Sequence, residues 1–146
     1  MTLILEGSKA LVLILLVSFL GVNSVSPQNP HHQKFLRQHL DFPQSNAGQD
    51  YCGVMMLRRR MSRPCKDTNS FVHLPIKQLK DICSWVGAHY RRALRVNKAQ
   101  ISVTTCKLQG TAQGRCFYGA HNGRRHILIS CDLAGWPIHF EESNSM

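Results

Sequence analysis

The chain has 146 residues, and its 18 Lys and Arg against 8 Asp and Glu give a formal net charge of +10. This length suits one domain, and a hydrophobic fraction of 43% excludes a wholly disordered chain. The charge predicts attraction to polyanions such as nucleic acid, heparin-like sugars or anionic membranes, but it does not define a fold.

Residues 1–26 have the features of a secretory signal peptide that is removed from the mature chain. Lys9 precedes the apolar run of residues 10–17, and small residues follow at Ser24 and Ser26. The run is shorter than the stretch of about 20 apolar residues that a transmembrane helix needs. We therefore expect cleavage near Ser26, at a position that the sequence does not fix, and a single extracellular domain over residues 27–146.

Six cysteines that meet an oxidising compartment predict three disulfide bonds. Spacing alone allows fifteen pairings of six cysteines. Zinc binding is the alternative, but the gaps are long and the chain has no Cys-x-x-Cys pair, so we expect neither a metal nor a cofactor. The cysteines are Cys52, Cys65, Cys83, Cys106, Cys116 and Cys131.

Helices are expected in the first half of the mature chain. After a polar lead-in that contains Pro30, the spacing of apolar residues predicts a helix over residues 32–40, which ends before Pro43. A second helix is predicted over residues 50–60, with Asp50 as its N-cap. A third is predicted over residues 75–85, with Pro75 in its first turn.

Strands are expected in the second half, where apolar residues alternate. A strand end is predicted at residues 71–74, and further strands over residues 90–96, 101–108, 116–120, 126–131 and 137–140. Residues 110–114 are expected to connect a hairpin, and the dipeptide Asn122-Gly123 is typical of a tight turn between two strands. Helices followed by antiparallel strands predict an α+β fold.

A basic protein can cleave RNA without a metal ion if it places two His and one Lys correctly. One His takes the proton of the ribose 2′-hydroxyl, the second gives a proton to the leaving oxygen, and the Lys balances charge on the phosphoryl oxygens. The chain has 8 His, so such a triad is available, but spacing alone does not say which of them meet.

Three segments resemble the pancreatic ribonuclease (ribonuclease A) superfamily. Residues 65–71, Cys-Lys-Asp-Thr-Asn-Ser-Phe, are similar to its signature Cys-Lys-x-x-Asn-Thr-Phe, with Ser70 where Thr is usual. Residues 34–39, Lys-Phe-Leu-Arg-Gln-His, resemble the first-helix segment that ends in a catalytic His. Residues 137–140, Pro-Ile-His-Phe, resemble the C-terminal strand that carries the other. The stretches around residues 51–67 and 103–110 are most similar to the angiogenin branch, whereas residues 83–90 match it poorly.

This resemblance implies a ribonuclease A-like α+β fold with three short helices and a bent antiparallel sheet. It pairs Cys52 with Cys106, Cys65 with Cys116, and Cys83 with Cys131, without the fourth disulfide of the pancreatic enzymes. The implied activity is a metal-independent endoribonuclease that cleaves RNA 3′ to pyrimidines through a 2′,3′-cyclic phosphate, with angiogenin-like activity. Its implied partners are RNA and, through its charge or family, heparin-like cell-surface polyanions, bacterial membranes and ribonuclease inhibitor, and the protein is expected to be a monomer.

The same resemblance assigns roles to residues. His39 is the implied general base, His139 the general acid, and Lys66 the group that stabilises the transition state. Glu141 stands where the family has Asp beside the C-terminal His, and its extra methylene is expected to misplace the carboxylate at some cost in rate. The residues implied to bind substrate are Lys34, Arg37, Gln38, Asn69, Ser70 and Phe140.

Two of the implied roles leave alternatives open. Asn69 is either a substrate-binding residue or a structural one that orients its loop. Glu142 stands where angiogenins have a Gln that obstructs the pyrimidine site, and the sequence does not decide whether Glu142 obstructs it here. Ser70 is expected to read a pyrimidine through its hydroxyl and its main-chain N–H, with looser positioning than Thr gives.

The run Arg58-Arg59-Arg60 has two interpretations. It resembles the nuclear-targeting run of angiogenins, which implies uptake into the nucleus or nucleolus of target cells, but a solvated basic helix end is the alternative. The charge also supports a second class of function, a cationic host-defence or angiogenic signalling protein in which catalysis is weak or secondary. No catalytic role is expected for the other six His, which are His31, His32, His73, His89, His121 and His126.

Overall fold

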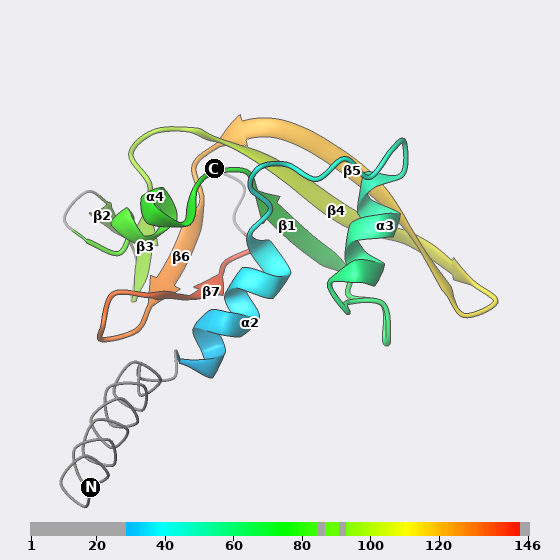
Figure 1. Ribbon diagram of the computed structural model, residues 1–146, viewed down its shortest axis with the longest axis horizontal. Coiled ribbons are helices and arrows are strands. Elements are labelled where there is room, and N and C mark those ends of the chain that lie inside the picture. The colour runs from blue at the N-terminus through cyan, green and yellow to red at the C-terminus, as the bar shows by residue number, and fades with distance from the viewer. Residues whose placement is uncertain (1–28, 85–86, 91–92, 144–146) are drawn as a thin grey trace, which may run out of the picture.

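The computed structural model describes residues 29–84, 87–90 and 93–143, which form three helices and two antiparallel sheets (Figure 1). The helices are α2 (Pro30–His39), α3 (Tyr51–Arg58) and α4 (Ile76–Asp81). The strands are β1 (Thr68–Val72), β2 (Ala88–His89), β3 (Leu94–Val96), β4 (Ile101–Ala112), β5 (Arg115–Arg125), β6 (Leu128–Cys131) and β7 (Pro137–Phe140). This arrangement confirms the predicted α+β class.

The two sheets share one continuous run of chain. One sheet has the order β1-β4-β5 and the other the order β2-β3-β6-β7, and the step from β5 to β6 joins them. Helix α3 packs on the long β4–β5 hairpin, whereas α2 contacts both β1 and β7 (Figure 1). Helix α2 therefore lies against one strand of each sheet, β1 in the first and β7 in the second.

The prediction of a turn at Asn122-Gly123 is wrong, because both residues lie inside β5. Asn122 pairs with Thr104 in the β4–β5 ladder, and its side-chain oxygen accepts a hydrogen bond from the Thr104 hydroxyl at 2.7 Å. The β4–β5 hairpin turns at Gln113 and Gly114, inside the connection predicted over residues 110–114, and their φ angles of 51° and 75° suit a two-residue turn with positive φ at both positions. The long ladder thus outweighs the local preference of the Asn-Gly dipeptide.

Helix boundaries also differ from the predicted ones. Helix α2 begins at Pro30, because the Asn29 side chain caps it by accepting from the His31 N–H at 2.9 Å. Asp50 caps α3 as predicted, accepting from the Gly53 N–H at 3.1 Å. Helix α4 is shorter than the predicted third helix, and turns follow it at residues 82–84.

The predicted signal peptide over residues 1–26 lies outside the described residues. So do both ends of the predicted domain (27–28 and 144–146), position 85 of the predicted third helix, and positions 91–92 of a predicted strand. Within the described ranges, no helix combines the length and apolarity needed to cross a membrane.

Two buried clusters and three disulfides hold these elements together. The larger cluster joins α2 and α4 to both sheets and includes Phe35, Leu79 and Ile129, while the second lies under α3 around Met56 and Phe71. The disulfides join Cys52 to Cys106, Cys65 to Cys116 and Cys83 to Cys131, which is the pairing that the resemblance implies. Each closes a loop of 48 to 54 residues, which corresponds to roughly 4 kcal/mol of chain entropy per bridge.

Candidate active site

An open cleft of about 610 Å³ lies beside α2 and β7. Its wall contains eight of the candidate site residues named in the sequence analysis, from α2, from the loop before β1, and from β7 and the residues after it. His39, Lys66 and His139, the three candidate catalytic residues, are among them. The lining residues are His31, Lys34, Phe35, Gln38, His39, Lys66, Ile138, His139, Phe140, Glu141, Glu142 and Ser143.

His39 is held in one orientation at the end of α2. Its Nδ1 lies 2.8 Å from the main-chain oxygen of Ser70, and because a carbonyl only accepts, Nδ1 carries the proton. In the neutral ring this leaves Nε2 with a free lone pair. The ring stacks on Phe140 at a centroid distance of 4.9 Å and touches Phe35 on another side.

The surroundings keep His39 neutral. The pKa of His39 is lowered to about 3, chiefly by burial and also by the nearby Lys66 and His139, although the hydrogen bond to the Ser70 carbonyl acts in the opposite direction. A neutral imidazole with a free Nε2 is a proton acceptor. The residue therefore has the protonation state that a general base requires.

Lys66 is fixed by a relay to α2. Its Nζ donates to Oδ1 of Asn69 at 2.8 Å, and Nδ2 of Asn69 donates to the main-chain oxygen of Gln38 at the same distance. Asn69 is completely buried and is not among the residues that line the cleft, and its two hydrogen bonds connect Lys66 to the backbone of α2. Burial lowers the pKa of Lys66, and the Glu142 carboxylate opposes that shift.

His139 is the exposed member of the group, with 57% of its side chain accessible. Oε2 of Glu141 lies 3.7 Å from its Nε2, which is beyond hydrogen-bond distance. The other carboxylate oxygen accepts from the Ser143 hydroxyl at 2.5 Å, and the hydrogen bonds from Ser143 lower the pKa of Glu141. One carboxylate oxygen of Glu141 is thus bonded to Ser143, while the other lies within ion-pair distance of His139.

Ser70 is occupied by the C-terminal segment of the chain itself. Its main-chain N–H donates to Oε1 of Glu142 at 2.7 Å, and its hydroxyl donates to Oε2 at 2.8 Å. These are the two groups expected to read a pyrimidine. Glu142 therefore covers the two groups of Ser70 that were expected to read a pyrimidine.

Arg125 and Thr105 also contact the Ser70 hydroxyl, and the sequence predicted this contact for neither residue. Nη2 of Arg125 donates to the Ser70 hydroxyl oxygen at 2.7 Å and to the Thr105 hydroxyl oxygen at 2.8 Å. The two hydroxyl oxygens are 3.0 Å apart. Thr105 is opposite Ser70 in the β1–β4 ladder, but Arg125 is paired with Ile101 at the far end of β4–β5, so no local pattern marks it.

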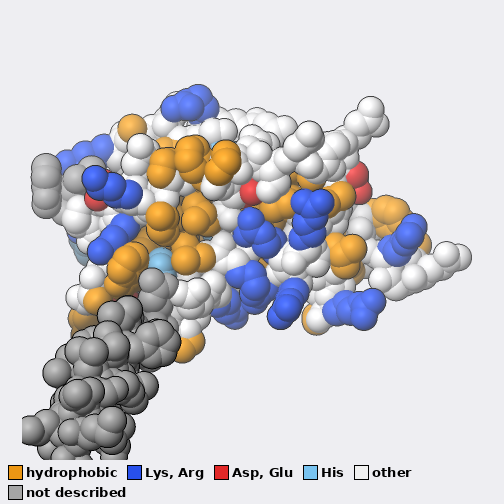
Figure 2. All heavy atoms as spheres, in the orientation of Figure 1, with side chains coloured by type: hydrophobic (Ala, Val, Ile, Leu, Met, Phe, Trp, Pro, Cys, Tyr) orange, Lys and Arg blue, Asp and Glu red, His pale blue; other side chains and the backbone are white. Residues whose placement is uncertain are grey.

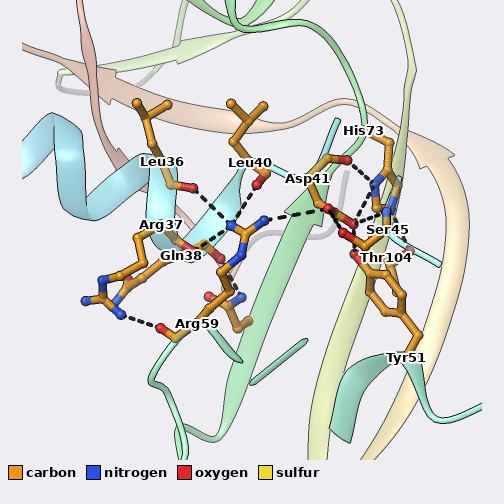
Figure 3. Close-up of polar contacts among 11 residues, drawn as sticks. Leu36, Arg37, Gln38, Leu40, Asp41, Ser45, Tyr51, Arg59, His73 and Thr104 are labelled. Atoms are coloured by element: carbon orange, nitrogen blue, oxygen red, sulfur yellow. Dashed lines mark hydrogen bonds and ion pairs between the residues drawn. The ribbon is translucent and has the colours of Figure 1, made fainter. Parts of the chain in front are cut away.

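Arg37 and Arg59 do not have the surroundings that the resemblance implied. Arg37 is absent from the cleft wall, and its Nη1 donates to the main-chain oxygen of Arg59 (Figure 3). Nη1 of Arg59 donates to the main-chain oxygens of Leu36, Arg37 and Leu40 at 2.8 to 3.3 Å. Arg59 thus satisfies carbonyls at the C-terminal end of α2, whereas Arg58 and Arg60 are exposed.

Asp41 anchors this corner of the fold directly after α2. Its carboxylate accepts from the hydroxyls of Ser45 and Tyr51 at 2.6 and 2.5 Å, and it lies 3.6 Å from Nη2 of Arg59 (Figure 3). Burial alone would raise the pKa of Asp41, but the hydrogen bonds from Ser45 and Tyr51 bring it below its usual value. His73 donates through Nδ1 to the Asp41 main-chain oxygen at 2.8 Å, so this His is structural.

Cationic side chains spread over much of the face shown in Figure 2, which has few acidic ones. This surface matches the formal charge of +10 and suits an extended polyanion. Within the part of the chain that the structure describes, no group of three or more His, Cys, Asp or Glu side chains could hold a metal ion.

The chain is similar to known ribonucleases over most of its length. The family model described as pancreatic ribonuclease matches residues 30–141. Angiogenin-4 of Mus musculus is 38% identical over 134 residues, with 89% of this chain and 92% of that protein covered. A ribonuclease of Chelydra serpentina is 40% identical over 116 residues, with 77% of this chain and 97% of that protein covered.

Solved structures agree with this assignment. The crystal structure of green turtle egg white ribonuclease superposes with a TM-score of 0.72 at 40% identity, covering 80% of this chain and all of that one. The sequence match and the shared fold support the same conclusion. The chain belongs to the pancreatic ribonuclease family and is a ribonuclease, with RNA as its substrate class.

Proposed function

We propose that this ribonuclease is secreted, cleaves RNA on the 3′ side of pyrimidines without a metal ion, and carries a base site closed by its own Glu142. The observation that carries the proposal is the meeting of His39, Lys66 and His139 in one cleft, with Nε2 of a neutral His39 free to accept a proton. Removal of a signal peptide at about residue 26 belongs to the same proposal, and the three disulfides suit an oxidising compartment.

In the proposed first step, Nε2 of His39 removes the proton of the ribose 2′-hydroxyl. The 2′-oxygen attacks phosphorus, the bond to the 5′-oxygen breaks, and His139 donates the proton that this leaving oxygen needs. The product is a 2′,3′-cyclic phosphate. Water then opens the ring with the two His in reversed roles, so both residues return to their starting protonation states.

Charge on the phosphoryl oxygens is stabilised by groups along the same wall. Lys66 supplies the cation, held in place by Asn69, and the side chain of Gln38 and the main-chain N–H of Phe140 act beside it. Lys34 lines the cleft and suits a flanking phosphate. Arg37 is bonded to Arg59, so we assign it no contact with the reacting phosphate.

Cleavage of RNA in a chelator-containing buffer tests this assignment. His39→Ala and His139→Ala should each abolish most of the activity, because each removes one of the two proton-transfer groups. His89→Ala is a matched control, since His89 is exposed on β2 and outside the cleft. Activity near the native level in either cleft variant would refute the assigned roles.

The closed base site and the cationic surface favour a second candidate function, angiogenin-like signalling or host defence in which slow catalysis is secondary. Arg58 and Arg60 are exposed and available to a receptor or a polyanion, whereas Arg59 is bonded to α2. Nuclear accumulation in target cells should therefore fall in an Arg58→Ala, Arg60→Ala double variant that leaves Arg59 in place. Unchanged accumulation would reject a nuclear-targeting role for these two residues.

A further inference from the structure

We propose that Arg125 sets the base preference of this enzyme, favouring cytidine over uridine at the position that Ser70 reads. This inference rests on the pyrimidine-specific cleavage proposed above. It concerns the Ser70 hydroxyl, which contacts Arg125 and Thr105 in addition to Glu142.

The partners of the Ser70 hydroxyl determine which of its hydrogen bonds it donates and which it accepts. A hydroxyl has one proton and two acceptor positions, an ionised carboxylate only accepts, and a guanidinium only donates. Because the Ser70 proton goes to Glu142 at 2.8 Å, it is not available to Thr105. Thr105 must then be the donor in the 3.0 Å contact, and Arg125 donates at 2.7 Å. Both acceptor positions of Ser70 are filled.

Glu142 therefore occupies the place that a base takes when it enters, and it meets Ser70 as an acceptor. Cytosine presents the same chemistry, since its O2 and N3 are both acceptors for the Ser70 main-chain N–H and hydroxyl. Uracil has an N–H at position 3, so Ser70 would have to accept from it. Ser70 would then donate its own proton to Thr105, so the Ser70–Thr105 hydrogen bond would reverse. The Thr105 hydroxyl proton would lose Ser70 as its acceptor.

Arg125 opposes this reversal through its charge as well as its hydrogen bond. The guanidinium lies against the hydroxyl oxygen, and it makes no ion pair with any Asp or Glu among the described residues. An unneutralised cation at this distance stabilises the lone pair of cytosine N3 and destabilises the outward-facing N–H dipole of uracil. Ser70 itself is completely buried, so water screens the interaction poorly.

The test compares kcat/KM for the dinucleotides CpA and UpA. The native enzyme should favour CpA by about threefold to tenfold, the factor that one net hydrogen bond contributes. Arg125→Met should bring this ratio close to one, while Arg125→Lys, which keeps a charged donor, should retain part of the preference. Arg124→Met is the matched control, because it loses the same charge from the neighbouring position and Arg124 bonds to the Gln100 main-chain oxygen instead.

A double-variant cycle shows whether Arg125 acts through Ser70. In a Ser70→Ala background the hydroxyl is gone, so Arg125→Met should leave the CpA-to-UpA ratio unchanged. A native ratio that Arg125→Met does not alter, or a native preference for UpA, would overturn this inference and leave the proposed function intact. Cleavage of neither dinucleotide, by the native chain and by Glu142→Ala, would overturn both.

Discussion

Replacing Glu142 by Ala should activate the enzyme, because the closed base site must open before a pyrimidine can bind. The carboxylate accepts two hydrogen bonds from Ser70, at 2.7 and 2.8 Å. Each such bond to a charged group is worth about 1.5–3 kcal/mol, and ordering each residue of the chain end costs about 1–2 kcal/mol. The two bonds together contribute about 3–6 kcal/mol, and ordering Glu141 and Glu142 offsets about 2–4 kcal/mol of this, so the net free energy of closure is on the order of 1–3 kcal/mol.

This free energy of closure determines how much kcat/KM should change when the site is opened. A substrate that binds only the open form has its apparent affinity reduced by the open fraction, so 1–3 kcal/mol corresponds to roughly a 5- to 150-fold loss. Glu142→Ala should raise kcat/KM for CpA by a factor in that range, mainly through KM. The reaction is followed from initial rates with a dinucleotide, which is too short to respond strongly to surface charge.

A matched control separates opening of the site from a change in net charge. Asp81→Asn removes one negative charge from α4, outside the cleft wall, and should leave the rate for CpA unchanged. Glu142→Gln keeps one acceptor for Ser70 without the charge, so its rate should fall between those of the native chain and Glu142→Ala. Equal rates in the native chain and Glu142→Ala would refute the reasoning, because the closure would then have no energetic weight.

Three other predictions concern Arg59, His39 and Glu141. Arg59→Met should lower the free energy of unfolding by about 2–4 kcal/mol, since it removes charged hydrogen bonds to α2, whereas Arg58→Met should have little effect in the same urea titration. Between pH 6.5 and about pH 3, His39 is protonated in the unfolded chain but neutral in the folded one. The free energy of unfolding should therefore fall as the pH drops through this window. His39→Gln should remove that part of the fall, and an equal fall in both proteins would contradict the assignment. Glu141→Asp should raise kcat a few-fold if the shorter carboxylate leaves Ser143 and reaches His139; an unchanged kcat would show that the Glu141 contact to Ser143 does not limit the rate.

The elements that the sequence predicted well are those whose signals are local. The apolar face of α2, the cap at Asp50 and the alternating pattern of β4 each depend on residues a few positions apart. The three motifs around His39, Lys66 and His139 likewise correspond to residues that the fold brings to one cleft. Their catalytic roles remain predictions for the variants above to test.

The features that the sequence did not reveal depend on contacts between distant residues. Arg125 reaches Ser70 across 55 positions, and Glu142 reaches it across 72. Asn122-Gly123 has a strong local turn preference, yet it is fixed in a ladder that begins at Ile101. Arg59 is part of a basic run in the sequence, and only its hydrogen bonds to the main-chain oxygens of Leu36, Arg37 and Leu40 show that it binds the end of α2.

The placement of the two candidate proton-transfer residues has a consequence for how the cleft forms. His39 ends α2 and His139 lies on β7, so the two are 100 positions apart along the chain. They meet only because α2 packs against β7. A change that loosens this packing should therefore separate the two His and lower activity, even where it leaves both side chains intact.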